Sequence, residues 1–337
     1  MHPELGRRFD DAIRDEAARR YGIPPSDLAP LAAFENFVFE GSSEDGIELV
    51  LRVSHSTRRT FEYTLGEVEF VRYLAAAGIP VAQPVLADSG HFVERLGEAA
   101  ATDYFVATAF QRAPGHVFDD APPLKEQYWK PALFRDLGRT FARLHERART
   151  FTPSSPRLKR QEWHEYDVVD IARFAPPDET LVRERTRAIM ERLERLPRDP
   201  SGYGLIHADL HPHNFCFDDG RITVFDFDNC EYAWFVKDIA VILFYVARAE
   251  PAERRDAAAA DFLAPFLEGY RELRPCEATW LAAVPDILKL QRAMNYALFH
   301  QTRDHDRVDD ASRDAWRRFR RDIEADTPVL KLDFARF

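Results

Sequence analysis

The stretch that most restricts the fold of this chain is Gly204–Asp228, which reads GLIHADLHPHNFCFDDGRITVFDFD. Short apolar runs alternate here with polar turns, and residues 217–220 (FDDG) have the composition of a tight turn ahead of a short strand at Arg221–Phe225. The sequence on either side follows a helical period instead. A pair of strands embedded among helices predicts an α+β fold.

Three oxygen-bearing side chains in this stretch suit phosphoryl transfer from a nucleotide. Asp209 can accept or orient the proton of an attacking hydroxyl group. Asn214 and Asp226 offer an amide and a carboxylate oxygen, which are the hard ligands that Mg²⁺ prefers beside phosphates. Loop, turn and strand should bring both ligands to one end of a hairpin. His207 completes the candidate catalytic residues, with a bracing role in the loop rather than a chemical one.

A different metal chemistry uses some of the same residues. His207 and Asp209 form half of a two-histidine, one-carboxylate iron site, with His211 or His213 as the second histidine. Such oxygenases are all-β barrels, whereas this segment is surrounded by helices. The sequence therefore favours the phosphoryl-transfer interpretation over an iron site.

The first third of the chain predicts a small sheet with one helix. Thr64–Ala76 has apolar residues at a nearly helical spacing and ends before Gly78. Runs rich in aromatic and branched residues predict strands, the first two joined by the turn signal GSSEDG into a hairpin. These strands are expected at Ala32–Glu40, Ile47–Val53, Ala82–Asp88 and Tyr104–Phe110.

The rest of the chain predicts a larger, mainly helical part. A helix carrying Phe134 to Leu144, another over Asp178–Leu196, and helices from Lys237 onward surround the strand pair. Gln111–Pro123 is rich in proline, glycine and polar residues and marks a boundary. We therefore expect a nucleotide-covering N-lobe over residues 1–110 and a C-lobe with the catalytic loop and acceptor site over residues 111–337.

Composition excludes several classes of function. The formal net charge of −11 argues against nucleic-acid binding, which requires basic surface, and it permits a cationic substrate. No apolar run is long enough for a membrane helix, and the charged N-terminus lacks the core of a secretion signal. Three cysteines without paired spacing make a disulfide framework improbable and fit a reducing cytoplasm.

Four segments resemble the aminoglycoside phosphotransferase and choline kinase-like family. These are HADLHPHN at 207–214, VFDF at 224–227, KDIA at 237–240, and the LG and LH pairs at the two ends of residues 137–145. The first has the His-x-Asp-Leu-x-x-x-Asn spacing of a kinase catalytic loop. The resemblance implies a two-lobed, protein-kinase-like fold, ATP or GTP as the phosphoryl donor with Mg²⁺, and the roles given above for Asp209, Asn214 and Asp226.

The first half matches this family more loosely. Phe34–Phe39, which includes Asn36, resembles the nucleotide-covering loop, and Gln111 lies where a hinge would bind adenine. The helix glutamate of the family corresponds to Glu67, but Arg52 replaces the strand lysine that should pair with it.

Arg52 leaves four interpretations open. It can substitute directly for the lysine, serve a shifted nucleotide, mark a pseudokinase, or be a surface strand residue. On a strand it would lie on the side opposite Leu51 and Val53. Asp228, at the glycine position of the kinase Asp-Phe-Gly, is either an outer carboxylate of the metal site or a cap of the following turn.

The acceptor is predicted only by class. The segment between Asp228 and Asp238 is too short for a typical activation loop, which favours a small hydroxylated acceptor of the aminoglycoside, choline or homoserine kind. The alternatives are a protein Ser/Thr kinase of the stress-response type and a non-catalytic nucleotide-binding protein. The oligomeric state is not encoded in any feature that the sequence displays.

Overall fold

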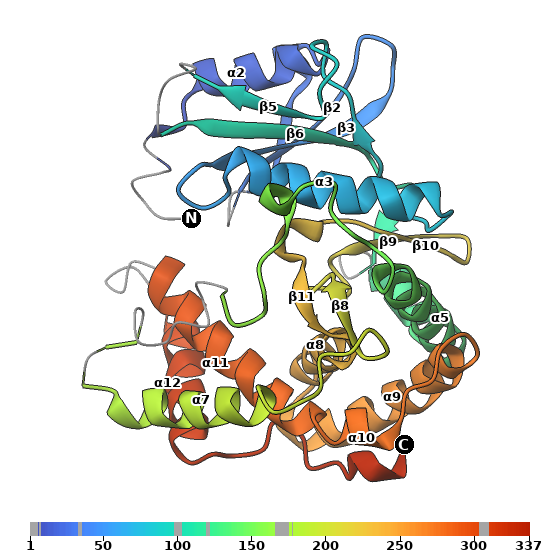
Figure 1. Ribbon diagram of the computed structural model, residues 1–337, viewed down its shortest axis with the longest axis vertical. Helices are drawn as coiled ribbons and strands as arrows, with labels where there is room; N and C mark the ends of the chain where they lie inside the picture. The colour runs from blue at the N-terminus through green and yellow to red at the C-terminus, as the bar shows by residue number, and fades with distance from the viewer. Residues whose placement is uncertain are drawn as a thin grey trace. The chain divides into compact units, whose positions relative to one another are not determined.

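The computed structural model describes residues 6, 8–32, 36–97, 103–118, 122–165, 175–176, 178–302 and 310–337. The chain divides into two compact units (Figure 1). The first comprises Met1–Gly115, Phe151–Arg160 and Thr223–Asp228, and the second comprises His116–Thr150, Gln161–Ile222 and Asn229–Phe337. The first unit is thus assembled from three separate parts of the sequence, which a division into residues 1–110 and 111–337 does not express.

The first unit is built on an antiparallel sheet in the order β1-β2-β3-β6-β4, with β5 also paired to β6. Its strands are β1 (Ala29–Ala32), β2 (Phe37–Ser42), β3 (Glu48–His55), β4 (Pro84–Val85), β5 (Val93–Leu96) and β6 (Phe105–Gln111). The predicted hairpin is confirmed as β2 and β3, in register from Phe37 opposite Val53 to Ser42 opposite Glu48.

Two helices cover opposite faces of this sheet (Figure 1), namely α2 (Asp11–Arg20) and α3 (Phe61–Ala76). Leu51 and Val53 point to one face, in the apolar cluster that holds Ala17 and Ala18 of α2. The other face carries Val106, which packs with Val68 of α3. Because side chains alternate along a strand, residue 52 must face α3.

The observed bounds differ from the predicted ones for local reasons. Helix α3 begins three residues before Thr64, because Thr60 accepts a hydrogen bond from the Tyr63 amide at 3.2 Å and caps the helix there. The strand predicted at Ala82–Asp88 is only Pro84–Val85, since proline has no amide hydrogen for the ladder. Of the strand predicted at Ala32–Glu40, residues 33–35 lie outside the described part of the chain.

The second unit is mainly helical. Its helices are α4 (Pro122–Tyr128), α5 (Pro131–Ala148), α7 (Thr180–Leu193), α8 (Phe235–Arg248), α9 (Arg255–Arg271), α10 (Ala278–Leu281), α11 (Val284–Thr302) and α12 (Asp310–Glu324). Five short strands accompany these helices. The last two residues of one of them, β10, belong to the first unit. The strands are β7 (His116–Val117), β8 (Tyr203–Ile206), β9 (Phe215–Asp218), β10 (Arg221–Val224) and β11 (Glu231–Trp234). They pair as β10-β9-β7 and as β11-β8.

Short helical turns occupy several connections in both units. They are η1 (Pro25–Asp27), η2 (Pro156–Leu158), η4 (Phe227–Asn229), η5 (Ala252–Arg254) and η7 (Phe334–Arg336).

Helices α5 and α9 approach unusually closely through two glycines. A Cβ at Gly138 would lie 2.0 Å from the Phe266 carbonyl oxygen, and one at Gly269 would lie 2.1 Å from the Arg135 carbonyl oxygen. Both distances are far below van der Waals contact, so only glycine fits. This packing places the C-terminal end of α5, with His145, beside Tyr270 at the end of α9.

Strand β11 was not predicted, and it explains the neighbouring aromatic residues. It pairs antiparallel with β8, from Glu231 opposite Ile206 to Trp234 opposite Tyr203. Trp234 is buried and donates through its indole nitrogen to the Pro197 carbonyl oxygen at 2.9 Å. Helix α8 follows at once and begins at Phe235, two residues before Lys237, so Asp238 lies in its first turn.

No helix in the described part of the chain combines the length and apolarity needed to cross a membrane.

Candidate active site

The loop that follows β8 in the second unit is anchored by one buried carboxylate. Asp238 Oδ1 accepts a hydrogen bond from the Ala208 amide at 2.7 Å, and its Oδ2 accepts one from the His207 amide at 3.2 Å. Asp238 itself is fully buried. Two consecutive backbone N–H groups are thus fixed at the start of the predicted catalytic loop.

A buried chain of side chains holds Asp238 in turn. His145 Nε2 lies 3.0 Å from Asp238 Oδ2, and His145 Nδ1 lies 2.9 Å from the Tyr270 hydroxyl. Burial lowers the pKa of His145 against the opposing effect of Asp238, so the ring is neutral at neutral pH. Helices α5 and α9 therefore set the position of the loop through His145.

Ala208 adopts a backbone conformation that favours glycine. Its φ is +67°, in the left-handed region, where a Cβ costs about 1–2 kcal/mol. The paired amide of Ala208 holds this conformation against the strain.

Asp209, the predicted base, follows directly. Its side chain is 27% exposed. Its backbone amide donates to His207 Nδ1 at 3.3 Å, and the bracing role of His207 in the loop stays a prediction. Tyr245 and His211 lie beside the carboxylate: the Tyr245 hydroxyl is 3.5 Å and His211 Nε2 is 3.6 Å from Asp209 Oδ1. Both separations are too long for strong hydrogen bonds, so the carboxylate keeps capacity to accept a proton.

His211 and Tyr245 form one rigid wall next to Asp209. Their rings stack with centroids 4.0 Å apart, and His211 Nδ1 accepts from the His213 amide at 3.3 Å. A neutral His211 ring then carries its hydrogen on Nε2, the nitrogen that faces Asp209. This orientation makes His211 a second polar neighbour of the base.

Asn214 is tied into the same loop. Its side-chain amide donates to the Asp209 carbonyl oxygen at 2.8 Å, and its backbone amide donates to the His211 carbonyl oxygen at 2.8 Å. Because the side-chain nitrogen is used inside the loop, the amide oxygen is the atom left for a cation. Asn214 immediately precedes β9, and Asp226 lies two residues after β10, the strand that pairs with β9.

In the first unit Arg52 replaces the expected lysine in its ion pair. Arg52 Nη2 lies 2.5 Å from Glu67 Oε2 of α3, and Nη1 lies 3.4 Å from Asp226 Oδ1. Arg52 is only 4% exposed, so its interpretation as a surface strand residue is wrong, while its predicted orientation opposite Leu51 and Val53 is confirmed. Burial opposes the charge, but the carboxylates, Glu67 first, raise the pKa of Arg52.

Asp226 remains accessible. Its side chain is 49% exposed, and its backbone has φ +61°, a second non-glycine residue in the left-handed region. A carboxylate held in this strained conformation beside a buried arginine is typical of functional positions.

Asp228 is instead buried among cations. Arg59 Nε lies 2.9 Å from Oδ1, and Asn36 Nδ2 donates to Oδ2 at 3.1 Å. Burial alone would raise the pKa of Asp228, but Arg59, Arg52 and Arg58 hold it well below the ordinary value. The sequence predicted Asp228 either as an outer carboxylate of the metal site or as a cap of the following turn. It did not predict the contacts with Arg59 and Asn36.

The remaining predicted nucleotide contacts are placed as follows. The Asn36 side chain is buried, and its Oδ1 accepts from the Ser54 hydroxyl at 2.8 Å, so both ends of this amide are engaged. Gln111 is the last residue of β6 and is exposed, with its amide donated to the Gln83 carbonyl oxygen at 2.7 Å. Their assignment to nucleotide binding stays a prediction.

Sequence reasoning missed several residues around these groups. Arg59 and Arg160 carried no signal beyond their charge, and His211 and Tyr245 were not connected with Asp209. For His145 a signal existed, because the LH pair at 144–145 belongs to the family pattern, but only the fold shows what this histidine contacts.

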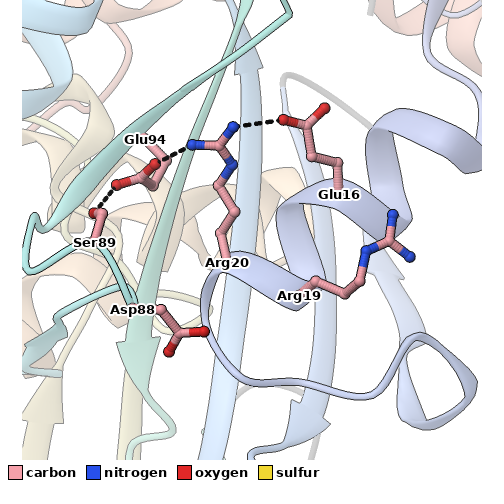
Figure 2. Close-up of a pocket in the computed structure, with 6 residues that line it drawn as sticks. All are labelled: Glu16, Arg19, Arg20, Asp88, Ser89 and Glu94. Atoms are coloured by element: carbon pink, nitrogen blue, oxygen red, sulfur yellow. Dashed lines mark hydrogen bonds and ion pairs between the residues drawn. The ribbon is translucent and has the colours of Figure 1, made fainter.

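A pocket lies on the first unit (Figure 2). None of the residues that line it is a predicted site residue. Its volume is about 370 Å³, and Arg20, Glu16 and Glu94 lie at its centre. Arg20 donates to Glu16 at 2.7 Å and to Glu94 at 2.5 Å, while Ser89 donates to Glu94. Arg20, Glu16, Glu94 and Ser89 thus bind one another, and Arg19 and Asp88 complete the lining.

Clusters suited to a transition metal are not found in the described residues, where no three His, Cys, Asp or Glu side chains are grouped to hold an ion. The iron-site alternative, with His207, Asp209 and a second histidine, therefore gains no support. A magnesium ion on a nucleotide requires fewer protein ligands, since phosphates and water complete its shell.

Comparison with known proteins gives matches over most of the chain. Residues 27–276 match the family described as the phosphotransferase enzyme family. The chain is 34% identical to amicoumacin kinase of Bacillus subtilis (strain 168) over 338 residues, which cover 99% of this chain and 98% of that protein. It is 30% identical to homoserine kinase of Methylobacterium radiotolerans over 263 residues, or 73% of this chain and 75% of that one.

Among solved structures, amicoumacin kinase hAmiN in complex with AMP-PNP, Ca²⁺ and Ami is similar over the whole length. The TM-score is 0.93 with 35% sequence identity, covering 100% of this chain and 99% of that chain.

Proposed function

Because the chain belongs to the phosphotransferase enzyme family, we propose that it transfers the terminal phosphoryl group of ATP to a hydroxyl group of an amicoumacin-type small molecule. The family resemblance and the α+β, protein-kinase-like fold predicted from the sequence are confirmed, and the chain is a phosphotransferase with an alcohol group as acceptor. The observation that carries the choice of acceptor is the likeness to amicoumacin kinases along essentially the whole chain.

Asp209 is the proposed base. Phosphoryl transfer requires a group that orients the acceptor hydroxyl and takes its proton as the new oxygen–phosphorus bond forms. The carboxylate is partly exposed, its loop is fixed at two amides by Asp238, and His211 lies beside it. A fixed base next to a solvent-accessible space supports proton acceptance without rearrangement of the loop.

Asn214 and Asp226 are the proposed protein ligands of a nucleotide-bound Mg²⁺. Their oxygen atoms are of the hard kind that this ion prefers, and Asp226 is half-exposed in a fixed backbone conformation. When bound, the ion would neutralise charge that develops on the phosphates. The Ca²⁺ and AMP-PNP in the complex of amicoumacin kinase hAmiN support a divalent cation with an adenine nucleotide.

The ion pair of Arg52 with Glu67 supports catalysis over a non-catalytic role. Its geometry is that of the lysine–glutamate pair that kinases require between strand and helix. An arginine keeps the charge that the phosphates need. The proposed function therefore includes Arg52 as a cation beside the nucleotide.

Incubation of the purified protein with ATP, Mg²⁺ and amicoumacin tests the proposal, with product detected by mass spectrometry and ADP release measured in parallel. We expect a product heavier by one phosphoryl group. Asp209→Asn should lower kcat by roughly 100-fold or more while nucleotide binding persists. Homoserine and a generic protein substrate serve as competing acceptors. Turnover with homoserine or with protein, and none with amicoumacin, would replace the proposed acceptor.

A further inference from the structure

Asp228 sits at the centre of a set of contacts that belongs wholly to the first unit. Its two carboxylate oxygens are taken by different partners, Oδ1 by Arg59 Nε at 2.9 Å and Oδ2 by Asn36 Nδ2 at 3.1 Å. Asp228 is 3% exposed. An oxygen already engaged by a cationic or amide donor is a poor ligand for a metal ion, because the two would compete for the same lone pairs.

The backbone of Asp228 is held as firmly as its side chain. Arg160 Nη2 donates to the Asp228 carbonyl oxygen at 2.6 Å, and Arg160 Nη1 donates to the Tyr63 carbonyl oxygen at 2.8 Å. Arg160 is 2% exposed and ends the segment Phe151–Arg160, which joins the first unit from elsewhere in the chain. One guanidinium thus connects the segment that carries Asp226 to the first turn of α3.

The Tyr63 ring joins the two arginines. The guanidinium carbon of Arg160 lies 3.4 Å from its centroid and that of Arg59 lies 5.0 Å from it. Planar guanidinium groups stack well on aromatic rings, and a lysine would lose this contact. Arg59 and Arg160 are therefore fixed relative to each other through α3, and they present their donors to Asp228 from a rigid support.

The consequence reaches Asp226, two residues earlier. Its left-handed φ of +61° is less favourable than a right-handed conformation, although aspartate adopts it more readily than most residues with a Cβ. Anchoring Asp228 at its side chain and its carbonyl group imposes the path of this short segment. Arg52 completes the arrangement, because its Nη1 lies 3.4 Å from Asp226 Oδ1 and 4.0 Å from Asp228 Oδ1.

We propose that Asp228 is a positioning residue, clamped by Arg59, Arg160 and Asn36, which sets the direction of the Asp226 carboxylate and is not itself a ligand of the cation. The inference deepens the proposed function and rests on Asp226 as a cation ligand. It assigns a role to Arg59, whose side chain has no oxygen atom to offer a metal and contacts Asp228 Oδ1 at 2.9 Å.

Mn²⁺ binding to the protein with AMP-PNP, measured by electron paramagnetic resonance, separates the two roles of Asp228. Arg59→Ala and Asp228→Asn should each weaken Mn²⁺ binding roughly tenfold or more, as loss of a partner behind a metal ligand does. Asp226→Asn should abolish it. The loss in the double variant should be smaller than the sum of the two single losses, because the two residues contact each other. Arg59→Lys should restore part of the affinity.

Kinetics supply the second readout. In both single variants kcat should fall while the KM for the acceptor stays unchanged, since the proposed clamp acts on the cation ligand Asp226. Arg135→Ala is the matched control, because Arg135 Nε also contacts a carboxylate, Glu268, at 2.8 Å but at an exposed position. It should bind Mn²⁺ like the unaltered protein. Should Arg59→Ala not fold, Arg59→Lys and Asp228→Asn carry the comparison.

Normal Mn²⁺ binding in Arg59→Ala with complete loss in Asp228→Asn would overturn the proposal and make Asp228 a direct ligand. Normal binding in both variants would also overturn it. Failure of the unaltered protein to bind Mn²⁺ with AMP-PNP would instead contradict the proposed function itself, so the two failures are distinguishable.

Discussion

Replacement of Asp238 by asparagine is the sharpest test of how the fold positions the base. The carboxylate accepts from the Ala208 amide at 2.7 Å and the His207 amide at 3.2 Å, and it contacts His145 Nε2 at 3.0 Å. An asparagine of the same shape has one acceptor oxygen. If that oxygen keeps Ala208, its NH₂ group faces both the His207 amide and His145 Nε2, so the buried His207 N–H loses its partner and His145 must change tautomer to accept a hydrogen bond.

The expected loss of stability follows from the buried N–H group that is left without a partner. A buried N–H without a partner lowers the free energy of unfolding by about 1–3 kcal/mol. The loop that carries Asp209 is no longer fixed at both amides, and a displacement of the base by about 1 Å lowers kcat by roughly 100-fold. Nucleotide affinity should change little, because Arg52 and Glu67 lie in the other unit.

The assays are urea unfolding and steady-state kinetics, with Asp256→Asn as the control. Asp256 also accepts a backbone amide, that of Lys331 at 2.8 Å, but at an exposed site, and should show neither effect. An Asp238→Asn protein with unaltered stability and unaltered kcat would refute the anchoring role.

Three further substitutions test the backbone strain at Ala208, the close packing at Gly138 and the protonation of His145. Ala208→Gly removes the left-handed strain at φ +67° and should raise the free energy of unfolding by about 0.5–1 kcal/mol after the entropy of glycine is subtracted, which urea unfolding can detect. Gly138→Ala places a Cβ 2.0 Å from the Phe266 carbonyl oxygen and should destabilise the protein by roughly 1–3 kcal/mol or more, with a lower melting temperature. His145 has a pKa lowered by burial, so the unfolded chain binds a proton that the folded chain does not. Stability should fall as pH drops below about 6.5, and His145→Gln should flatten this fall; parallel curves would contradict it.

The sequence predicted those features that depend on local patterns. Composition of turns and alternation of apolar residues were enough for the β2–β3 hairpin, and helical spacing was enough for α3. The expectation that Arg52 lies opposite Leu51 and Val53 followed from strand geometry alone. The fold class and the family followed from motifs with fixed spacing.

Features that depend on distant parts of the chain could not be predicted. Arg160 reaches the Asp228 carbonyl oxygen across 68 positions of sequence, and His145 reaches Asp238 across 93. Burial of Arg52 depends on Glu67 and on the close packing of α3, neither of which a strand pattern encodes. The same holds for Asp228, whose neighbours come from two other segments of the first unit.

The central claim is that this chain phosphorylates a small hydroxylated acceptor with Asp209 as the base. Phosphorus NMR of a reaction with ATP, Mg²⁺ and amicoumacin tests it most directly, with the unaltered protein and Asp209→Asn side by side. We expect a phosphate ester signal that grows as ADP forms with the unaltered protein, and almost none with the variant. Equal ester formation by both proteins would contradict it.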